Sequence, residues 1–183
     1  PSPTQVNLIQ QDSIAKDLTT LKLWQPDATI VIIHWGDEYH RLPNAEQKRL
    51  ASFMIDNGAT LVIGSHPHVI QPMQRWYSGK IPHYVTDFRA SNAIVYSLGN
   101  FVSNQERTHT DGGAITYFTL VKENNRTEIV DASYSLVWVY KPIEKNVKRY
   151  YILPVENFED KSEFFQQGYY SRFMQFVKDA RSL

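Results

Sequence analysis

Two unbroken apolar runs stand out in the hydropathy pattern of the chain, at residues 28–33 and 60–65. Continuous apolar runs are typical of strands that are covered on both faces, as strands of parallel sheets are. A parallel pair needs a crossover of a dozen or more residues, which is usually helical. The segment between the runs is long enough for such a crossover, so this part of the chain predicts a strand–helix–strand unit.

The intervening segment 44–57 has the pattern of an amphipathic helix. Asn44 is a favourable N-cap residue, and Gln47 follows it at the spacing of a capping box. Apolar side chains recur at helical spacing along one face, and charged side chains occupy the other. Gly58 is a favourable C-terminal stop, so we expect the helix to end there.

The rest of the chain contains further patterns that are typical of helices and strands. Apolar residues at helical spacing predict a helix over 4–24, and a short apolar run predicts a third strand over 93–97. Farther along, the pattern predicts a hairpin of 114–122 with 127–140 and a terminal helix over 158–181. Alternation of strands and helices in this order is typical of an α/β fold.

Length and composition limit the class of protein. The 183 residues are expected to form a single domain fragment, with a βαβ core at 1–105 and a β-rich extension and terminal helix at 106–183. With 42% hydrophobic and 21% charged residues, the composition is that of a soluble globular protein. The net charge of zero argues against a nucleic-acid partner, because such proteins normally carry a basic patch.

Several absences narrow the possibilities further. The chain has no cysteine, which excludes disulfides and Cys-ligated zinc and fits an extracytoplasmic protein. No apolar run reaches the roughly 18 residues of a membrane-spanning helix. No nucleophile elbow, phosphate-binding loop or dinucleotide-binding glycine motif is present. The chain begins Pro1-Ser2-Pro3 without an initiator methionine, so we interpret it as a fragment or a processed form.

Both strands of the predicted unit run into histidine: His34 after the first, and His66-Pro67-His68 after the second. Proline favours an extended conformation at His66, and residues two apart in an extended chain project to the same side, roughly 6.5 Å apart. Ligands of open α/β sheets bind beyond the carboxyl ends of the strands. We therefore expect the three imidazoles to converge as ligands of one metal ion or two. Such a donor set suits zinc, iron or manganese better than magnesium or calcium.

Two other polar residues near these strand ends are candidates for catalysis. Glu38 follows the first strand and is a candidate partner of a metal ligand or a general acid/base, whereas Asp37 beside it is expected to be solvated. Asn100 follows the third strand, where it would either coordinate a metal or donate to an anion. A simple glycine–asparagine turn explains Asn100 equally well. Three further histidines lie in polar loops, where we expect exposed side chains: His40, His83 and His109.

At these residues the sequence resembles the bacterial capsule-synthesis proteins of the CapA (poly-γ-glutamate biosynthesis) type. Order and spacing agree over residues 14–102, and the similarity is loose beyond residue 105. The matching stretches include His34-Trp35-Gly36-Asp37-Glu38-Tyr39, Gly64-Ser65-His66-Pro67-His68 and Tyr96-Ser97-Leu98-Gly99-Asn100-Phe101. A set of motifs in this order is far more specific than any one of them.

The family looks like calcineurin-type metallophosphoesterases, which have a layered α/β fold with a dinuclear metal site at strand ends. The resemblance implies that His34, His66 and His68 are metal ligands. It also implies that the remaining ligands come from an N-terminal half, in Gly-Asp and Asn-His motifs that do not occur before His34. The expected fold is therefore a layered calcineurin-like fold without its N-terminal half, ending in a β-hairpin region and a terminal helix.

The resemblance further implies a protein of capsule or poly-γ-glutamate-type exopolymer biosynthesis or export, with a metal-dependent hydrolase-like site. Two divalent ions would be its cofactors, as manganese, iron or zinc. Two alternatives stay open: a phosphoesterase acting on another substrate, and a non-catalytic scaffold of a polymer-export complex. The implied partners are the N-terminal half of the same protein, a membrane polymer-synthesis complex, and an anionic polymer or phosphoester. The implied location is the extracytoplasmic cell envelope, with a membrane anchor in a segment outside this chain.

Overall fold

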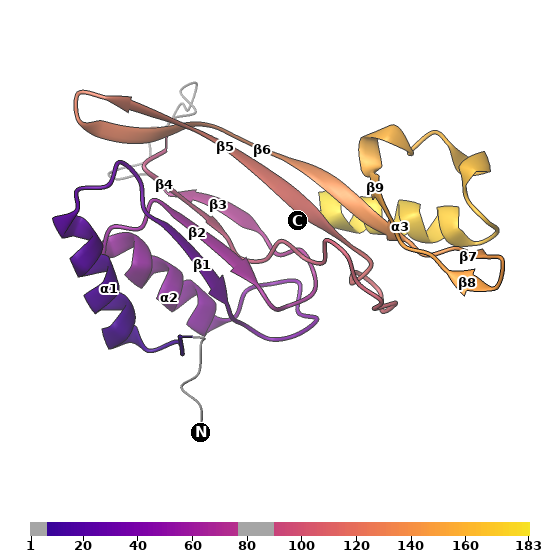
Figure 1. The fold of residues 1–183 in the computed structure, drawn as a ribbon, viewed down its shortest axis with the longest axis horizontal. Helices are drawn as coiled ribbons and strands as arrows, with labels where there is room; N and C mark the ends of the chain where they lie inside the picture. The colour runs from indigo at the N-terminus through magenta and orange to yellow at the C-terminus, as the bar shows by residue number, and fades with distance from the viewer. Residues whose placement is uncertain (1–6, 77–89) are drawn as a thin grey trace.

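A four-stranded sheet with helices on one side and a long hairpin on the other organises the chain (Figure 1). The computed structural model describes residues 7–76 and 90–183, apart from the side chains of residues 75 and 76. The strand order is β1 (Ile30–His34), β2 (Leu61–Ser65), β4 (Asn92–Val95) and β3 (Met73–Trp76). The first three strands are parallel, and β3 runs antiparallel to β4. The α/β class predicted from the alternating pattern is confirmed.

The crossover between β1 and β2 is helix α2 (Ala45–Asp56). Its capping box forms as the spacing predicts: the Asn44 side chain accepts from the Gln47 backbone N–H, and the Gln47 side chain accepts from the Asn44 backbone N–H. Helix α1 (Gln11–Leu23) lies beside α2 (Figure 1). Buried side chains of both helices pack on one face of the sheet: Leu18, Leu50, Met54 and Ile55 against Ile33, Val62 and Ile94.

The opposite face of the sheet is covered by the hairpin of β5 (Gly112–Glu123) and β6 (Arg126–Tyr140). Ile129 of β6 is buried against Leu61 and Ala93, which lie on the sheet face away from the helices. A register shift at Thr119–Leu120 marks a bulge in the hairpin. The hairpin crosses the sheet diagonally and continues into the C-terminal part of the chain (Figure 1).

Strand β1 is not covered in this way. On the face away from the helices, Ile30 and Ile32 are 56% and 82% exposed. On the face towards the helices, Ile33 is only 6% exposed. The prediction of a strand buried on both faces is therefore wrong for β1 and right for β2, whose residues are buried or half-buried. The physical reason is position: β1 is an edge strand of the sheet, and the hairpin packs over β2 and β4 instead.

The C-terminal part has a second core that is rich in aromatic rings. Strand β6 pairs with β9 (Tyr151–Pro154), and helix α3 (Tyr169–Arg181) packs against their inner side. Trp138 lies at the centre of this core, with its ring edge-on to several neighbours: Phe165, Tyr169 and Phe173. A two-stranded ribbon of β7 (Ile143–Glu144) and β8 (Val147–Lys148) extends from the end of β6.

Several predicted element bounds are wrong. The terminal helix predicted from residue 158 begins only at Tyr169, and two short 3₁₀ helices, Val155–Asn157 and Ser162–Phe164, precede it. Gly168 has φ = 85°, a left-handed conformation that redirects the chain before α3. The first helix begins at Gln11 rather than at residue 4, and residues 1–6 lie outside the described range. Within the described ranges, no helix is long and apolar enough to span a membrane.

The two faces of β1 provide a matched pair of substitutions. We expect Ile33→Ala to lower the free energy of unfolding of this chain by about 2–5 kcal/mol, because it leaves a cavity under the helices. Ile32→Ala removes the same atoms from an exposed position and is expected to cost less than about 1 kcal/mol. Urea unfolding followed by circular dichroism measures both values. Equal losses in the two variants would contradict the open face of β1.

Candidate functional site

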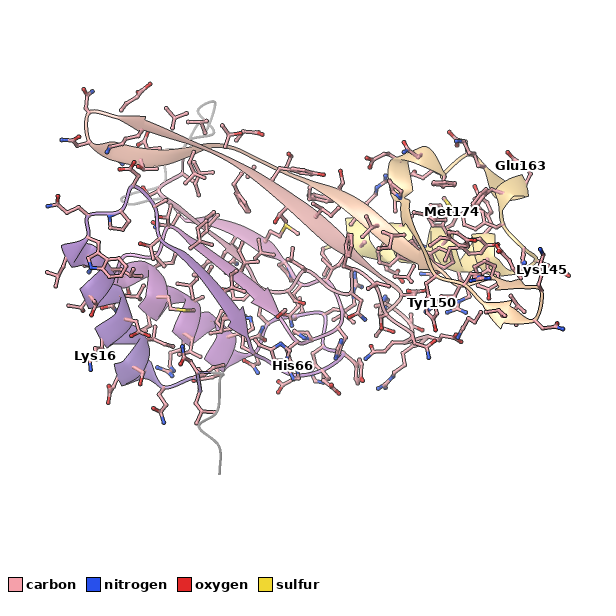
Figure 2. All side chains as sticks on the ribbon, in the orientation of Figure 1. Lys16, His66, Lys145, Tyr150, Glu163 and Met174 are labelled. Atoms are coloured by element: carbon pink, nitrogen blue, oxygen red, sulfur yellow. The ribbon has the colours of Figure 1, made fainter. Side chains whose placement is uncertain are left out.

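The parallel pairing of β1 and β2 brings the two histidine-bearing loops together. His34 is in register with Ser65, so both strands end at the same level. The pairing continues into the loops, where the Trp35 N–H donates to the Ser65 carbonyl at 3.0 Å and the Tyr39 N–H donates to the Pro67 carbonyl at 2.8 Å. Figure 2 shows His66 just beyond the arrowheads of these strands, at one rim of the sheet.

The three predicted histidines converge at this rim. The ring centroids of His34 and His66 are 4.5 Å apart, and those of His66 and His68 are 6.1 Å apart. We call these three residues the histidine cluster. Glu38 joins it from the loop after β1, with its Oε1 atom 3.5 Å from Nε2 of His68. The juxtaposition predicted from topology is confirmed, whereas the assignment of metal ligands stays a prediction.

One set of donor atoms within the site is close enough to share an ion. Glu38, His66 and His68 each offer one ligand atom, and these atoms all lie within 4.8 Å of one another. His34 lies beside this set, with its Nδ1 atom 3.3 Å from the Ser65 hydroxyl oxygen. Asp37, the neighbour of Glu38, is exposed and accepts a hydrogen bond from the Asn44 side chain at 2.8 Å.

The backbone of the His-Pro-His segment differs from the extended form predicted for it. His66 has φ = 105° and His68 has φ = 60°, and the facing Tyr39 has φ = 67°. Such conformations cost non-glycine residues about 1–3 kcal/mol each and persist only where surrounding contacts hold them. The hydrogen bond from the Tyr39 N–H to the Pro67 carbonyl is one such contact. The imidazoles of His66 and His68 therefore lie on the same side because the backbone turns tightly between them, and not because it is extended.

Asn100 determines how His68 presents its ring. The Asn100 Nδ2 group donates to the Thr110 carbonyl at 2.8 Å, so its Oδ1 atom is the one that lies 3.0 Å from Nδ1 of His68. An amide oxygen only accepts, so neutral His68 carries its proton on Nδ1 and has its lone pair on Nε2. That lone pair faces the Glu38 carboxylate, and two acceptors in this position need a proton or a cation between them.

This geometry bears on the role expected for Asn100. Both ends of its amide are taken up, one by His68 and the other by Thr110, and the side chain lies behind the imidazole. Asn100 is 9% exposed. The arrangement favours a positioning residue that acts through His68 over a residue that coordinates a metal directly.

A buried chain of glutamines holds the loop that carries Glu38. The Gln47 Nε2 group donates to the Gln71 side-chain oxygen at 2.8 Å, and the Gln71 Nε2 group donates to the His40 carbonyl at 2.8 Å. Both side chains are fully buried. Gly36 packs against Gln47 so closely that a Cβ atom there would lie 2.5 Å from the amide carbon. Gln71 was not predicted as a site residue, because an isolated glutamine after an apolar stretch gives no signal in the sequence.

The electrostatics of the site favour the neutral form of the His34 imidazole. Burial, followed by the proximity of His66 and His68, lowers the pKa of His34 below its ordinary value of 6.5. A lowered pKa leaves the ring nitrogen unprotonated near neutral pH, and a metal ligand must be unprotonated.

The remaining histidines lie apart from the cluster. His40 is exposed, as expected. His109 is not simply exposed, because its Nδ1 atom lies 3.2 Å from the Asp179 carboxylate on helix α3. That contact depends on the packing of α3, which local sequence does not encode. His83 lies outside the described residues.

Comparison with known proteins supports the family suggested by the motifs. The model of the family described as "Bacterial capsule synthesis protein PGA_cap" matches residues 1–105. "Capsule biosynthesis protein CapA" of Bacillus anthracis is 37% identical over 124 residues, 68% of this chain and 26% of that protein. "PGA biosynthesis protein CapA" of Bacillus subtilis (strain 168) is 40% identical over 96 residues, 52% of this chain and 22% of that protein. The chain thus spans about a quarter of the length of these relatives.

Replacing Asn100 tests its effect on the neighbouring imidazole. In Asn100→Leu, we expect His68 to lose its preference for a proton on Nδ1, and we expect stability to fall by about 1–3 kcal/mol because the Thr110 carbonyl loses its donor. Long-range ¹H–¹⁵N spectra of the histidine rings report the tautomer. Asn104→Leu is the matched control, because Asn104 is exposed and its hydrogen bonds go to Lys148 and Tyr150. An unchanged His68 tautomer in Asn100→Leu would contradict the assignment.

The lowered pKa of His34 predicts how metal-free stability depends on pH. Below pH 6.5 the unfolded chain binds a proton at His34 more readily than the folded chain does. Stability should therefore fall as pH drops from about 7.5 to about 5.5, and the contribution of His34 vanishes above its unfolded pKa. We expect His34→Gln to flatten this dependence. Urea midpoints at the two pH values provide the measurement, and a steeper dependence in the variant would contradict the sign.

Proposed function

Because this chain belongs to the bacterial capsule synthesis protein family PGA_cap, we propose that it forms part of a divalent-metal site in a protein of exopolymer synthesis or export. The observation that carries the proposal is the close approach of Glu38, His66 and His68 at one rim of the sheet. The names of the relatives, which refer to capsule and PGA biosynthesis, support the biological setting.

The donor chemistry favours a particular class of ion. Imidazole nitrogens with one carboxylate oxygen suit zinc, iron or manganese, whereas magnesium and calcium prefer oxygen donors throughout. His66 and His68 would bind through nitrogen and Glu38 through oxygen, with His34 beside them for a second ion. When bound, the metal would lower the pKa of a water molecule and polarise a phosphoryl or acyl oxygen.

The residues of this chain would have three kinds of task in such a site. Glu38 and the histidine cluster would hold the ion and set the net charge of the site. Asn100 keeps the proton of His68 on Nδ1, so that Nε2 remains free to bind. The buried Gln47–Gln71 pair fixes the loop that presents Glu38. The direction of the lone pairs is thus set before any metal or substrate arrives, which lowers the cost of organising the site.

The proposal includes completion of the site by another part of the same protein. Metallophosphoesterase-type sites of the kind this family resembles need acidic ligands besides the histidines. Strand β1 offers a place for them, because it is an edge strand that ends in His34 and has Ile30 and Ile32 exposed along it. We propose that a segment of the full-length protein outside this chain covers β1, completing a layered calcineurin-like fold and adding the missing ligands.

The substrate of this site would be a phosphoester or an anionic polymer such as poly-γ-glutamate, processed at the cell envelope. The envelope setting rests on the relatives' role in capsule biosynthesis. A membrane anchor and a polymer-synthesis complex as partner belong to the same proposal and would involve parts of the protein beyond this chain. If the site fails to retain metal, the same fold would instead serve as a scaffold for such a complex.

Metal analysis of the full-length protein tests the proposal. We expect the purified protein to retain manganese, iron or zinc, and His66→Ala with His68→Ala to lower the metal content at least about tenfold, because two of the three close donors are lost. His40→Ala is the matched control, since His40 is exposed and its side chain is not part of the donor set. Equal metal content in the wild type and the double variant would remove both residues from the ligand set.

A further inference from the structure

Arg107 carries a cationic group beside the histidine cluster, from a part of the chain outside the family match at residues 1–105. Its guanidinium carbon lies 4.1 Å from the centroid of the Tyr39 ring. The same tyrosine stacks on His68, with ring centroids 6.0 Å apart and planes inclined by 24°. Tyr39 therefore contacts both a proposed metal ligand and the guanidinium.

The turn that carries Arg107 is anchored to the site from its other side. Both the backbone N–H and the hydroxyl group of Thr110 donate to the Arg107 carbonyl, at 3.1 and 2.9 Å. Thr110 is fully buried, and its own carbonyl accepts from the Asn100 side chain that positions His68. The closed turn thus fixes the backbone position of Arg107, and the contact with the Tyr39 ring fixes the position of its guanidinium group.

The other charged side chains in this region have polar partners within the protein, and none of these partners forms an ion pair with Arg107. Lys148 pairs with Glu106 at 2.5 Å, and Arg172 lies 3.6 Å from Asp111. Arg41 donates to the Asp179 carbonyl at the end of α3. Within residues 7–76 and 90–183, no carboxylate lies within ion-pair distance of Arg107, and its side chain is exposed.

We propose that Arg107 binds the anionic oxygen group of the substrate next to the metal site. A planar guanidinium held on an aromatic ring is oriented to offer two parallel N–H groups to a carboxylate or a phosphate. Little side-chain entropy is lost on binding, because the ring contact already restricts the guanidinium. Arg107 would thereby favour anionic substrates over neutral ones of the same shape.

This inference rests on the proposed metal site, and its test separates the two. Full-length, metal-loaded protein is titrated with inorganic phosphate and with a γ-linked glutamate oligomer by calorimetry. A γ-linked glutamine oligomer serves as the neutral counterpart of the second probe. Metal content and the thermal midpoint are measured on the same samples, so that a loss of metal or of folding is recognised as such.

We expect Arg107→Gln to weaken binding of one or both anionic probes by about ten- to hundredfold, the usual effect of losing a charged hydrogen-bonding partner. Its metal content and thermal midpoint should match the wild type, and the neutral oligomer should bind no differently. Arg107→Lys keeps the charge without the two-pronged geometry and should bind with intermediate affinity. Arg126→Gln at the β5–β6 turn is the control for loss of one positive charge.

The pattern of losses identifies the group that Arg107 recognises. A loss confined to phosphate assigns it to a phosphoester substrate, and a loss confined to the glutamate oligomer assigns it to a carboxylate. Unchanged affinities in Arg107→Gln would overturn the proposal, as would failure of the metal-loaded wild type to bind either probe. A drop in metal content in Arg107→Gln would also overturn it, because Arg107 would then support the metal site itself. A protein that retains no metal at all refutes the proposed function instead.

Discussion

The parallel pairing of β1 with β2 is the constraint on which the site depends. Side chains alternate between the two faces of a strand, so a slip by one residue in this register would turn His34 towards the helices. With His34 opposite Ser65, the two loops leave the sheet at one level and continue to hydrogen-bond to each other. That continued pairing sustains the left-handed conformations of Tyr39, His66 and His68, which none of these residues favours alone.

The polar groups around the cluster are held by hydrogen bonds from distant parts of the chain. Gln47 and Gln71 lie between the helix layer and the loop of Glu38, and each is fully buried with its amide paired. Asn100 connects His68 to the Thr110 carbonyl, which belongs to the segment leading into β5. Buried polar groups are costly when unpaired, so the position of the histidine rings depends on these hydrogen bonds to other parts of the chain.

The C-terminal part therefore does more than cover the sheet. Its hairpin buries Leu61 and Ala93 on the face opposite the helices, and its aromatic core holds α3 against the end of β6. The segment between β4 and β5 supplies Thr110 and Arg107 to the neighbourhood of the histidines. Residues beyond the family match thus support and extend a site whose main motifs lie within it.

Three features could be predicted from the amino-acid sequence: the β1–α2–β2 unit, the capping box at Asn44 and the meeting of the histidines at one sheet edge. Hydrophobic periodicity and capping chemistry act over a few residues, so they can be recognised in the sequence. The meeting of the histidines follows from the shared direction of parallel strands. The open face of β1 and the departure of His66 from an extended backbone become apparent only in the folded structure. The same holds for the direction of the Asn100 amide and for the contact of Arg107 with Tyr39. Each of these depends on partners from distant positions in the sequence, and burial and hydrogen-bond partners of that kind are settled only when the elements pack.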